Sequence, residues 1–301
     1  MGIMVVGDLH LKDKMPYLLH QKKFLEWLNL NYKDYPLVLL GDEVDNSSPR
    51  WEMFAFLIDF LKNRNAMTYI LSGNHTYSRL KGNLLDGIKH LNNVKVFFKE
   101  EEFELDGYKC LALPYQYNMG HYNNISTSVD FVFGHLMIEQ EAFGGEYTKI
   151  ENIKYKYFIN GHIHHKRKYG NIILLGCPVI TRNGEENNPI LKIDNSFQME
   201  EIKHPETFKI LDIEYDDEIT DKECLYNIKD APSIQSVYAR YPDCYIREEG
   251  ITIRRDAVEF EELLNSNNEN KSLSQEFVCY AEEKGIDTEI QNCCLKYLEG
   301  I

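Results

Sequence analysis

Five short blocks of metal-ligand residues each follow an apolar run of strand length, and this order constrains the fold more than any other feature. The runs, at 3–6, 36–40, 68–71, 129–133 and 155–159, are rich in β-branched or aromatic residues, as expected for strands buried on both faces. The blocks that follow are Asp8-Leu9-His10, Gly41-Asp42-Glu43-Val44-Asp45, Gly73-Asn74-His75, Gly134-His135 and Gly161-His162-Ile163-His164. Because ligands in open α/β sheets gather beyond the carboxyl ends of the strands, we expect the blocks to meet in one cleft.

The residue types in these blocks suit two divalent cations held close together. Two cations roughly 3.5–4 Å apart need a shared carboxylate, together with oxygen and imidazole ligands. Asp42 is the natural bridge, and the alternate spacing of Asp8 with His10 lets both side chains reach one cation. The predicted metal ligands are Asp8, His10, Asp42, Asn74, His135, His162 and His164.

His75 follows Asn74 directly and lies in the same cleft, but it points elsewhere. This position suits a proton donor or charge stabiliser better than a ligand. Each block alone also has a simpler interpretation, because Asp-x-His can cap a turn and Gly and Asn favour turns with positive φ. The conjunction of five blocks in this order favours the metal site.

Composition places the chain among globular proteins. The net charge of −15, taken over the whole chain, argues against a nucleic-acid partner. This argument does not hold for the part with the metal-ligand blocks, because most of the negative charge lies in the C-terminal part. Residues 204–301 hold 23 of the 48 acidic and 10 of the 33 basic side chains, which leaves −2 for residues 1–203. The run His165-Lys166-Arg167-Lys168 is a local basic patch or a solvated turn. A polyanionic substrate is permitted but not indicated.

Nothing in the chain predicts a membrane protein. The first residues lack a basic leader region, and no apolar run is long enough to span a bilayer. Seven cysteines without regular spacing fit a reducing compartment. We therefore expect a cytoplasmic protein, or one of the host cytoplasm if a virus encodes it.

Strand-like and helix-like segments alternate up to about residue 203. Helical spacing occurs at 17–29 and 49–65 and, more weakly, at 79–92. Further strands are predicted at 94–98, 102–105, 108–113, 171–175, 189–193 and 197–202, which implies two sheets.

The remaining residues form an appendage. We expect a strand at 208–215, one or two more within 233–256, and helical segments at 257–264 and 272–299 after a polar linker. The predicted organisation is therefore a domain at 1–203, a small capping or DNA-binding-like region at 204–264, and a linker with C-terminal helices at 265–301.

The five blocks resemble the pattern of the calcineurin-like metallophosphoesterase superfamily. Three further stretches look like the SbcD-type nuclease subunits of double-strand-break repair complexes: Gly41-Asp42-Glu43-Val44-Asp45 continuing to Pro49, Leu113-Pro114-Tyr115, and Gly176-Cys177-Pro178 followed by Gly184-Glu185-Glu186. The compact C-terminal part looks most like the bacteriophage members of that family. The resemblance implies an α/β fold, a two-sheet αββα sandwich with a small α+β C-terminal appendage.

The resemblance also implies roles for individual residues. Metal 1 would be held by Asp8, His10, Asp42 and His164, and metal 2 by Asp42, Asn74, His135 and His162. A hydroxide bridging the two metals would attack phosphorus, with His75 as the catalytic histidine. Asp45 would orient His75, or merely cap the following turn.

Activity and partners follow from the same resemblance. It implies a nuclease using two divalent metal ions, Mn²⁺ first among them, that acts as a 3′-to-5′ exonuclease on duplex DNA ends and an endonuclease on single strands. The implied partners are an SMC-like ATPase bound by the C-terminal helices and a second copy of the chain, a homodimer through the helix at 49–65. That helix carries more apolar residues than one core-facing stripe needs, although it could also be fully buried.

Two departures and two alternatives accompany this interpretation. Thr76 stands where the family has an acid, and Cys177 stands where it usually has a hydroxyl residue. The alternatives are a phosphoesterase acting on a small phosphodiester, which would not need the added helices, and a scaffold of the same fold without turnover, which loss of ligands would mark.

Overall fold

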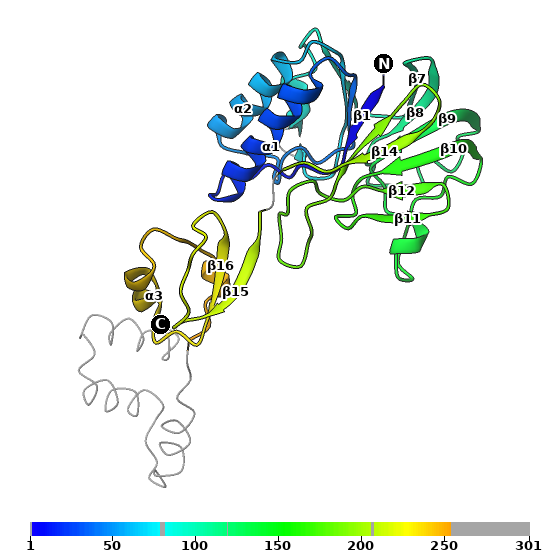
Figure 1. The fold of residues 1–301 in the computed structure, drawn as a ribbon. Helices are drawn as coiled ribbons and strands as arrows, with labels where there is room; N and C mark the ends of the chain where they lie inside the picture. The colour runs from blue at the N-terminus through cyan, green and yellow to red at the C-terminus, as the bar shows by residue number, and fades with distance from the viewer. Residues whose placement is uncertain (1, 79–81, 119, 206–207, 254–301) are drawn as a thin grey trace.

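The computed structural model describes residues 2–78, 82–118, 120–205 and 208–253. Within these ranges the chain forms two six-stranded sheets packed face to face (Figure 1). The first runs in the order β14 (Met199–Ile202), β13 (Ile190–Ile193), β1 (Ile3–Val6), β2 (Leu37–Leu39), β3 (Thr68–Leu71) and β6 (Val94–Phe97). The second runs β11 (Arg167–Tyr169), β12 (Ile172–Leu174), β10 (Ile153–Asn160), β9 (Thr127–Gly134), β8 (Tyr108–Leu113) and β7 (Glu101–Leu105). The predicted two-sheet sandwich is confirmed.

The strand β1 shows why these segments are apolar throughout. Ile3 and Val5 point into the core between the sheets, whereas Met4 and Val6 point to the opposite face, and all four are fully buried. A strand covered on both faces has no position for a polar side chain, so its sequence reads as a continuous apolar run. Polar residues begin only where the strand ends, and these are the residues of the five blocks.

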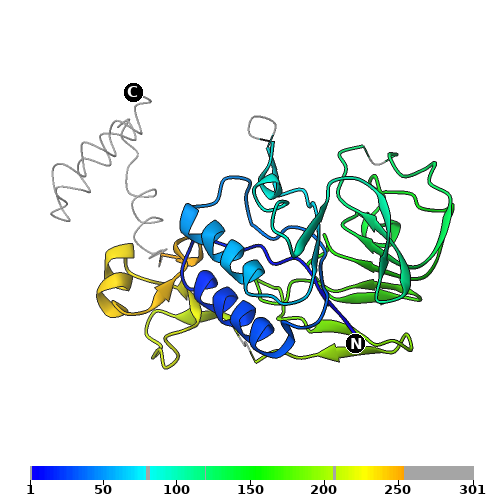
Figure 2. The same cartoon turned by 90° about the horizontal axis from the view of Figure 1, so that it is seen from above.

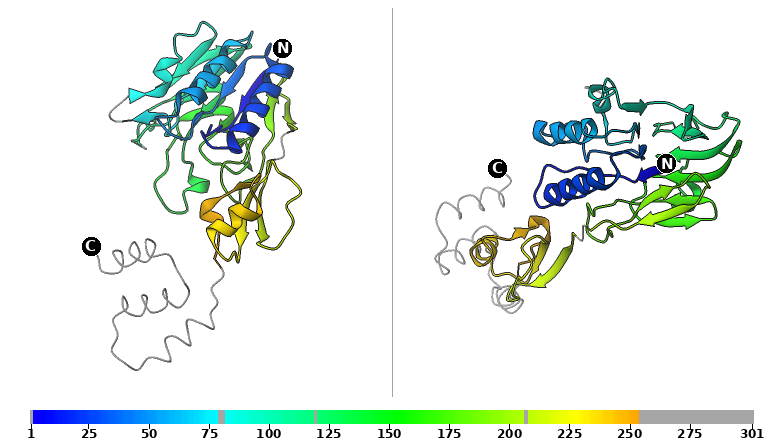
Figure 3. Two further views of the ribbon diagram at one scale, coloured as in Figure 1. Left: turned by 90° about the vertical axis from the view of Figure 1, so that its left-hand side faces the viewer. Right: turned by 45° about the horizontal axis from the view of Figure 1, so that its top comes forward.

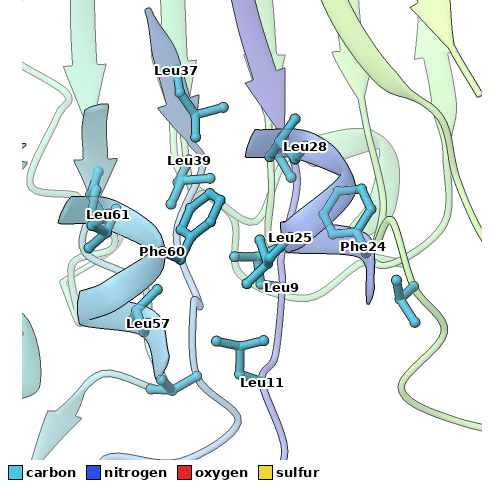
Figure 4. Close-up of a cluster of buried hydrophobic side chains, with 14 of the residues drawn as sticks. Leu9, Leu11, Phe24, Leu25, Leu28, Leu37, Leu39, Leu57, Phe60 and Leu61 are labelled. Atoms are coloured by element: carbon cyan, nitrogen blue, oxygen red, sulfur yellow. The ribbon is translucent and has the colours of Figure 1, made fainter. Parts of the chain in front are cut away.

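Helices α1 (Tyr17–Tyr32) and α2 (Trp51–Lys62) cover the outer face of the first sheet (Figures 2 and 3). Their buried leucines and phenylalanines pack on the strands and loops below them (Figure 4). Fully burying one such side chain contributes about 1.5–3 kcal/mol, so this layer fixes the first sheet firmly. No helix in the described ranges combines the length and apolar character needed to cross a membrane.

The outer face of the second sheet is covered differently. Tyr122, Leu136 and Ile138, from loops, pack on Val132 and Phe158. In this part of the described chain the covering segments contain the 3₁₀ turn η2 (Glu139–Glu141) rather than α-helices. The second helical layer of the expected αββα arrangement is thus replaced by loops.

The prediction of a helix at 79–92 is wrong for the described residues 82–92. Residues 79–81 lie outside the described ranges, and the segment then forms the short strand β5 (Gly82–Asn83), which pairs with β4 (Tyr77–Ser78), and the 3₁₀ turn η1 (Leu84–Gly87). The side chain of Asn83 accepts a hydrogen bond from the N–H of Leu85, which stabilises the turn.

A smaller sheet follows the sandwich. In the described part of the appendage it consists of the parallel strands β15 (Ile210–Glu214), β16 (Leu225–Lys229) and β17 (Tyr245–Ile246), with α3 (Ile234–Arg240) and the 3₁₀ turn η3 (Glu248–Gly250). This sheet packs beside α1, where Lys23 pairs with Glu223 at 2.8 Å and the ring of His20 stacks on Phe208. The helices predicted at 257–264 and 272–299 lie outside the described residues.

Candidate metal centre

The predicted ligands come from the ends of β1, β2, β3, β9 and β10 and meet at one edge of the sandwich. Two groups of possible ligand residues contain Asp42, and within each group the ligand atoms lie within 4.8 Å of one another. The first group is Asp8, His10 and Asp42, and the second is Asp42, His135 and His162. Asp42 belongs to both groups. This is the arrangement required of a carboxylate that bridges two cations.

Asp42 occupies the middle of the cluster. Its Oδ2 lies 3.2 Å from Nε2 of His135 and 3.7 Å from Nε2 of His10. Its Oδ1 accepts a hydrogen bond of 2.8 Å from the backbone N–H of His75. One carboxylate oxygen is therefore fixed by the neighbouring loop, while the other faces the imidazoles.

Asn74 connects the ligands of the second group. Its Oδ1 lies 3.1 Å both from Nε2 of His135 and from Nδ1 of His162. The other ring nitrogen of His135, Nδ1, donates a hydrogen bond of 2.8 Å to the carbonyl oxygen of Leu40. Since that bond fixes the ring, Nε2 of His135 is directed into the cluster.

His164 is oriented by Glu185. Its Nδ1 donates a hydrogen bond of 2.5 Å to Oε1 of Glu185, which leaves Nε2 as the ligand nitrogen. Oε2 of Glu185 in turn accepts from the backbone N–H groups of Thr181 and Arg182, at 2.7 and 2.9 Å. Burial would raise the pKa of Glu185, but these bonds and His164 lower it to about 2. Glu185 was not predicted as a site residue, although the stretch Gly184-Glu185-Glu186 was noted.

Unsatisfied polar atoms indicate that the cluster suits cations. Oδ2 of Asp8 and both ring nitrogens of His10 are buried without a hydrogen-bond partner, although both side chains are fully buried. Leaving such atoms unpaired costs about 1–3 kcal/mol each. Carboxylate, amide and imidazole groups are also the donors that divalent transition metals accept. The residues present therefore fit two divalent cations.

Two glycines of the blocks are required by close packing. A Cβ atom on Gly73 would lie 2.0 Å from Oδ1 of Asp42, and one on Gly161 would lie 2.4 Å from Oδ1 of Asp8. Any side chain at either position would displace a ligand carboxylate. The glycines before Asn74 and His162 thus have a steric role in the centre.

Three buried amides hold the ligand loops and were missed by the sequence analysis. From α1, Gln21 donates to the carbonyl oxygens of Leu9 and His10, at 3.0 and 2.8 Å. Asn160, at the end of β10, exchanges hydrogen bonds with the backbone of Leu136. Asn188 donates to the carbonyl oxygens of His164 and Cys177. Their sequence signal is weak, because a single amide within a helix or loop is usually exposed.

His75 and Asp45 lie at the edge of the cluster. Nε2 of His75 is 4.0 Å from Oδ2 of Asp42, and its side chain is 27% exposed. A carboxylate oxygen of Asp45 and ring nitrogens of His10 and His75 lie within 4.8 Å of one another. Oδ1 of Asp45 is 3.4 Å from Nδ1 of His10, and Oδ2 is 3.8 Å from Nζ of Lys12. The hydrogen bond between Asp45 and His75 is made by the main chain, at 2.6 Å to the Asp45 carbonyl oxygen.

Comparison with known proteins agrees with this geometry. The family described as calcineurin-like phosphoesterase matches residues 1–166, more than half of the chain. The chain belongs to this family.

Individual proteins are more distant from this phosphoesterase. Among solved structures, a protein described as a novel archaeal phosphodiesterase is 19% identical with a TM-score of 0.39, and the match covers 67% of this chain and 99% of that one. The nuclease MPE of Pseudomonas putida is 14% identical with a TM-score of 0.35, covering 66% and 87%. No curated protein sequence matches significantly.

Thr76 stands where the family pattern has an acid. The Thr76 side chain is buried, and its hydroxyl donates a hydrogen bond of 3.1 Å to the carbonyl oxygen of Gly73. Ser72 lies 3.3 Å away from the same hydroxyl. In this phosphoesterase Thr76 closes the turn that presents Asn74 and His75. It therefore brings no carboxylate to the cluster.

The imidazoles of the second group have opposite protonation tendencies. Burial opposes a charge on His135, but Asp42 and Asp8 beside it raise its pKa to about 9. Burial and the charge of His135 lower the pKa of His162 to about 3. His162 therefore offers a lone pair at neutral pH, whereas a cation binding at His135 must displace a proton.

Proposed function

We propose that this phosphoesterase is a metal-dependent DNA phosphodiesterase. The observation that carries the proposal is a cleft of about 900 Å³ between the sandwich and the appendage, which reaches the metal centre at Asp45. The cleft is much larger than a small diester requires. Its size and lining favour an extended polyanion.

The lining of the cleft is basic compared with the rest of the chain. The described residues that line it include five basic and four acidic side chains, whereas the whole chain has a net charge of −15. The basic residues are Lys12, Lys14, Arg50, Arg182 and Arg247. Lysine and arginine side chains that contact phosphates account for most of the non-specific affinity for nucleic acids.

Aromatic side chains lie beside His162, in the second group of ligands, and also support a nucleic-acid substrate. The ring centroid of Tyr115 lies 5.9 Å from that of His162. The centroid of Tyr117 lies 5.4 Å from that of Tyr115, and the centroid of Tyr77 lies 5.6 Å from that of Tyr117. Tyr117 and Tyr77 are 62% and 41% exposed. Exposed aromatic rings can stack the bases of a single strand that enters the metal centre.

The residues of the centre have distinct tasks in phosphodiester hydrolysis. Bound at this cluster, two divalent cations, which we propose to be Mn²⁺, supply Lewis-acid stabilisation of the phosphoryl oxygens and an activated water. Asp42 holds both halves of the centre together. Since Nδ1 of His75 is committed to the Asp45 carbonyl, His75 holds or donates a proton at Nε2, where it can serve the leaving oxygen.

The motifs that resemble SbcD-type subunits refine the proposal. We propose 3′-to-5′ exonuclease activity on duplex ends and endonuclease activity on single strands, in DNA repair or recombination. An SMC-like ATPase would bind the helices predicted within 265–301. A homodimer would form through α2, where Trp51 is 69% exposed at the first turn.

An assay of purified full-length protein with manganese tests the activity. Its substrates are end-labelled duplex DNA, single-stranded DNA and a small chromogenic diester, each with His75→Ala as the inactive control. We expect cleavage of both DNA substrates, with loss of label from 3′ ends. Cleavage confined to the small diester would contradict the proposal and favour a small-molecule phosphodiesterase.

A second assay addresses the partners. The DNA assay is repeated with a candidate SMC-like ATPase and ATP, and light scattering measures the mass of the protein alone and of Trp51→Glu. We expect the ATPase to increase cleavage and Trp51→Glu to convert a dimer into a monomer. Unchanged cleavage would contradict the ATPase partner, and a monomeric wild-type protein would contradict the homodimer.

A further inference from the structure

Cys177 lies against the first half of the metal centre. Its Sγ and ligand nitrogens of His10 and His164 all lie within 4.8 Å of one another, and the Cys177 side chain is fully buried. His10 and His164 are the imidazoles predicted for metal 1. Cys177, at the position where the family pattern usually has a hydroxyl residue, therefore brings a thiol beside this half of the centre.

The backbone of Cys177 is held in place by the same loops that hold the ligands. Its N–H donates a hydrogen bond of 3.2 Å to the carbonyl oxygen of His164. Its carbonyl oxygen accepts from the backbone N–H and the side-chain amide of Asn188, at 3.1 and 2.9 Å. The backbone that carries the thiol is thus fixed by three hydrogen bonds independent of any cation.

A second observation indicates a ligand at this point. Both ring nitrogens of His10 lack a hydrogen-bond partner although the side chain is fully buried. A buried imidazole is normally satisfied through at least one nitrogen, because an unpaired polar atom is costly. The nearest groups are the carboxylates of Asp45 and Asp42, at 3.4 and 3.7 Å, and neither makes a hydrogen bond to the ring. A nitrogen of His10 is therefore left for a cation in the cluster that also contains His164 and Cys177.

We infer that Cys177 supplies a thiolate ligand to the cation bound by His10 and His164. The inference rests on the proposed dinuclear centre. On binding, the S–H bond breaks, the proton leaves to solvent and the sulfur lone pair forms the bond to the cation, without any change of oxidation state. The first half of the centre then combines nitrogen and oxygen donors with one soft donor.

The donor set predicts different metal preferences for the two halves. Thiolate favours zinc, cobalt or iron(II) over manganese. The other half, with Asp42, Asn74, His135 and His162, has only oxygen and nitrogen donors and suits manganese. We therefore expect zinc, cobalt or iron(II) to displace manganese first from the half at His10, whereas manganese supplied alone occupies both halves.

Absorption spectroscopy of the cobalt(II) protein tests the inference independently of activity. Wild-type protein and Cys177→Ser are titrated with cobalt, with Cys110→Ser as control, because Cys110 is a buried thiol in the core between the sheets. We expect a sulfur-to-cobalt charge-transfer band in the wild type and in the control, and no band in Cys177→Ser. Zinc affinity of Cys177→Ser should fall by at least the roughly 10–100-fold seen when a ligand's hydrogen-bond partner is removed.

X-ray absorption of the wild-type zinc protein provides a second measurement that needs no variant. Because the spectrum averages over both zinc ions, we expect one sulfur neighbour per two zinc ions, at about 2.3 Å. Binding of two cobalt ions without the band, or a zinc shell of nitrogen and oxygen alone, would overturn the thiolate and leave the dinuclear centre intact. Failure of the wild type to bind cobalt or zinc would overturn both.

Discussion

Nδ1 of His75 donates a hydrogen bond of 2.6 Å to the main-chain carbonyl oxygen of Asp45. A carbonyl oxygen can only accept, so Nδ1 carries the proton and Nε2 is the nitrogen that faces Asp42. The ring is therefore oriented by the backbone of the loop after β2. The main-chain carbonyl of Asp45 makes the hydrogen bond that orients the ring, and the carboxylate of Asp45 lies near ring nitrogens of both His10 and His75.

The variant Asp45→Asn separates these two contacts. Because the carbonyl oxygen that orients His75 is retained, we expect kcat at the optimum pH to stay near the wild-type value. Cation affinity should decrease, because Oδ1 of Asp45 lies 3.4 Å from Nδ1 of His10 and contributes negative charge there. Steady-state kinetics from pH 6 to 9 and a metal titration check both expectations. A shifted pH profile with unchanged metal affinity would show that the carboxylate acts on His75.

Replacement of His75 by alanine should remove catalysis and leave the metal centre intact. The expected loss in kcat is about 10²–10⁴-fold, the usual contribution of a general acid or base. Metal content is expected to stay at the wild-type value, because the ligand atoms come from other residues. Single-turnover kinetics and elemental analysis of the same preparation measure the two quantities. Loss of bound metal would instead make His75 a ligand.

Glu185 should stabilise the fold in a pH-dependent way. Its folded-state pKa of about 2 lies below the ordinary value of 4.5. Its contribution to the free energy of unfolding is therefore complete above pH 4.5 and is lost as pH falls from 4.5 toward 2. The full effect is roughly 3 kcal/mol at most, at 1.36 kcal/mol per pH unit.

The variant Glu185→Gln provides the measurement. Urea unfolding with a chelator present, at pH 7, 5 and 4, compares the variant with the wild type. We expect the wild type to be more stable at pH 7 and 5, by an amount that begins to shrink at pH 4. A difference that grows toward low pH would contradict the role of Glu185 as an ionised partner of His164.

Arg182 and Arg247 should contribute to DNA affinity through phosphates. For Arg182→Ala or Arg247→Ala we expect weaker binding to every DNA sequence and a salt dependence shallower by about one unit of slope. Lys89→Ala is the control, since Lys89 pairs with Asp86 away from the cleft. Fluorescence anisotropy with labelled oligonucleotides at several salt concentrations measures the slopes. Equal slopes for wild type, arginine variants and control would exclude the cleft as the binding surface.

The strands that carry the ligands were predictable because burial on both faces leaves a continuous apolar sequence. The strand at Thr68–Leu71 has the predicted bounds. The strands predicted at 102–105 and 108–113 form a hairpin through Asp106 and Gly107, with positive φ at both residues. Ligand positions followed from the rule that strand ends share an edge. The orientation of each ring did not, because it depends on partners distant in sequence, such as Leu40 for His135.

The appendage was less predictable. The strand β16 was missed, since its central Asn227 disfavours a strand and is accommodated by a hydrogen bond to Asp212. One or two strands were expected within 233–256, and β17 is there. The helix α3 that precedes it was not predicted; it begins with a capping box between Ser233 and Ser236. This helix buries only Val237, so its periodicity gives little signal. The short edge strand β11, within the basic run after His164, was also missed.

Electron paramagnetic resonance of the protein titrated with manganese tests the central claim, that Asp42 holds two cations in one centre. The account predicts two manganese ions per chain with a spin-coupled signal, and loss of the coupling in Asp42→Ala. A single bound ion, or two ions without coupling in the wild type, would contradict it.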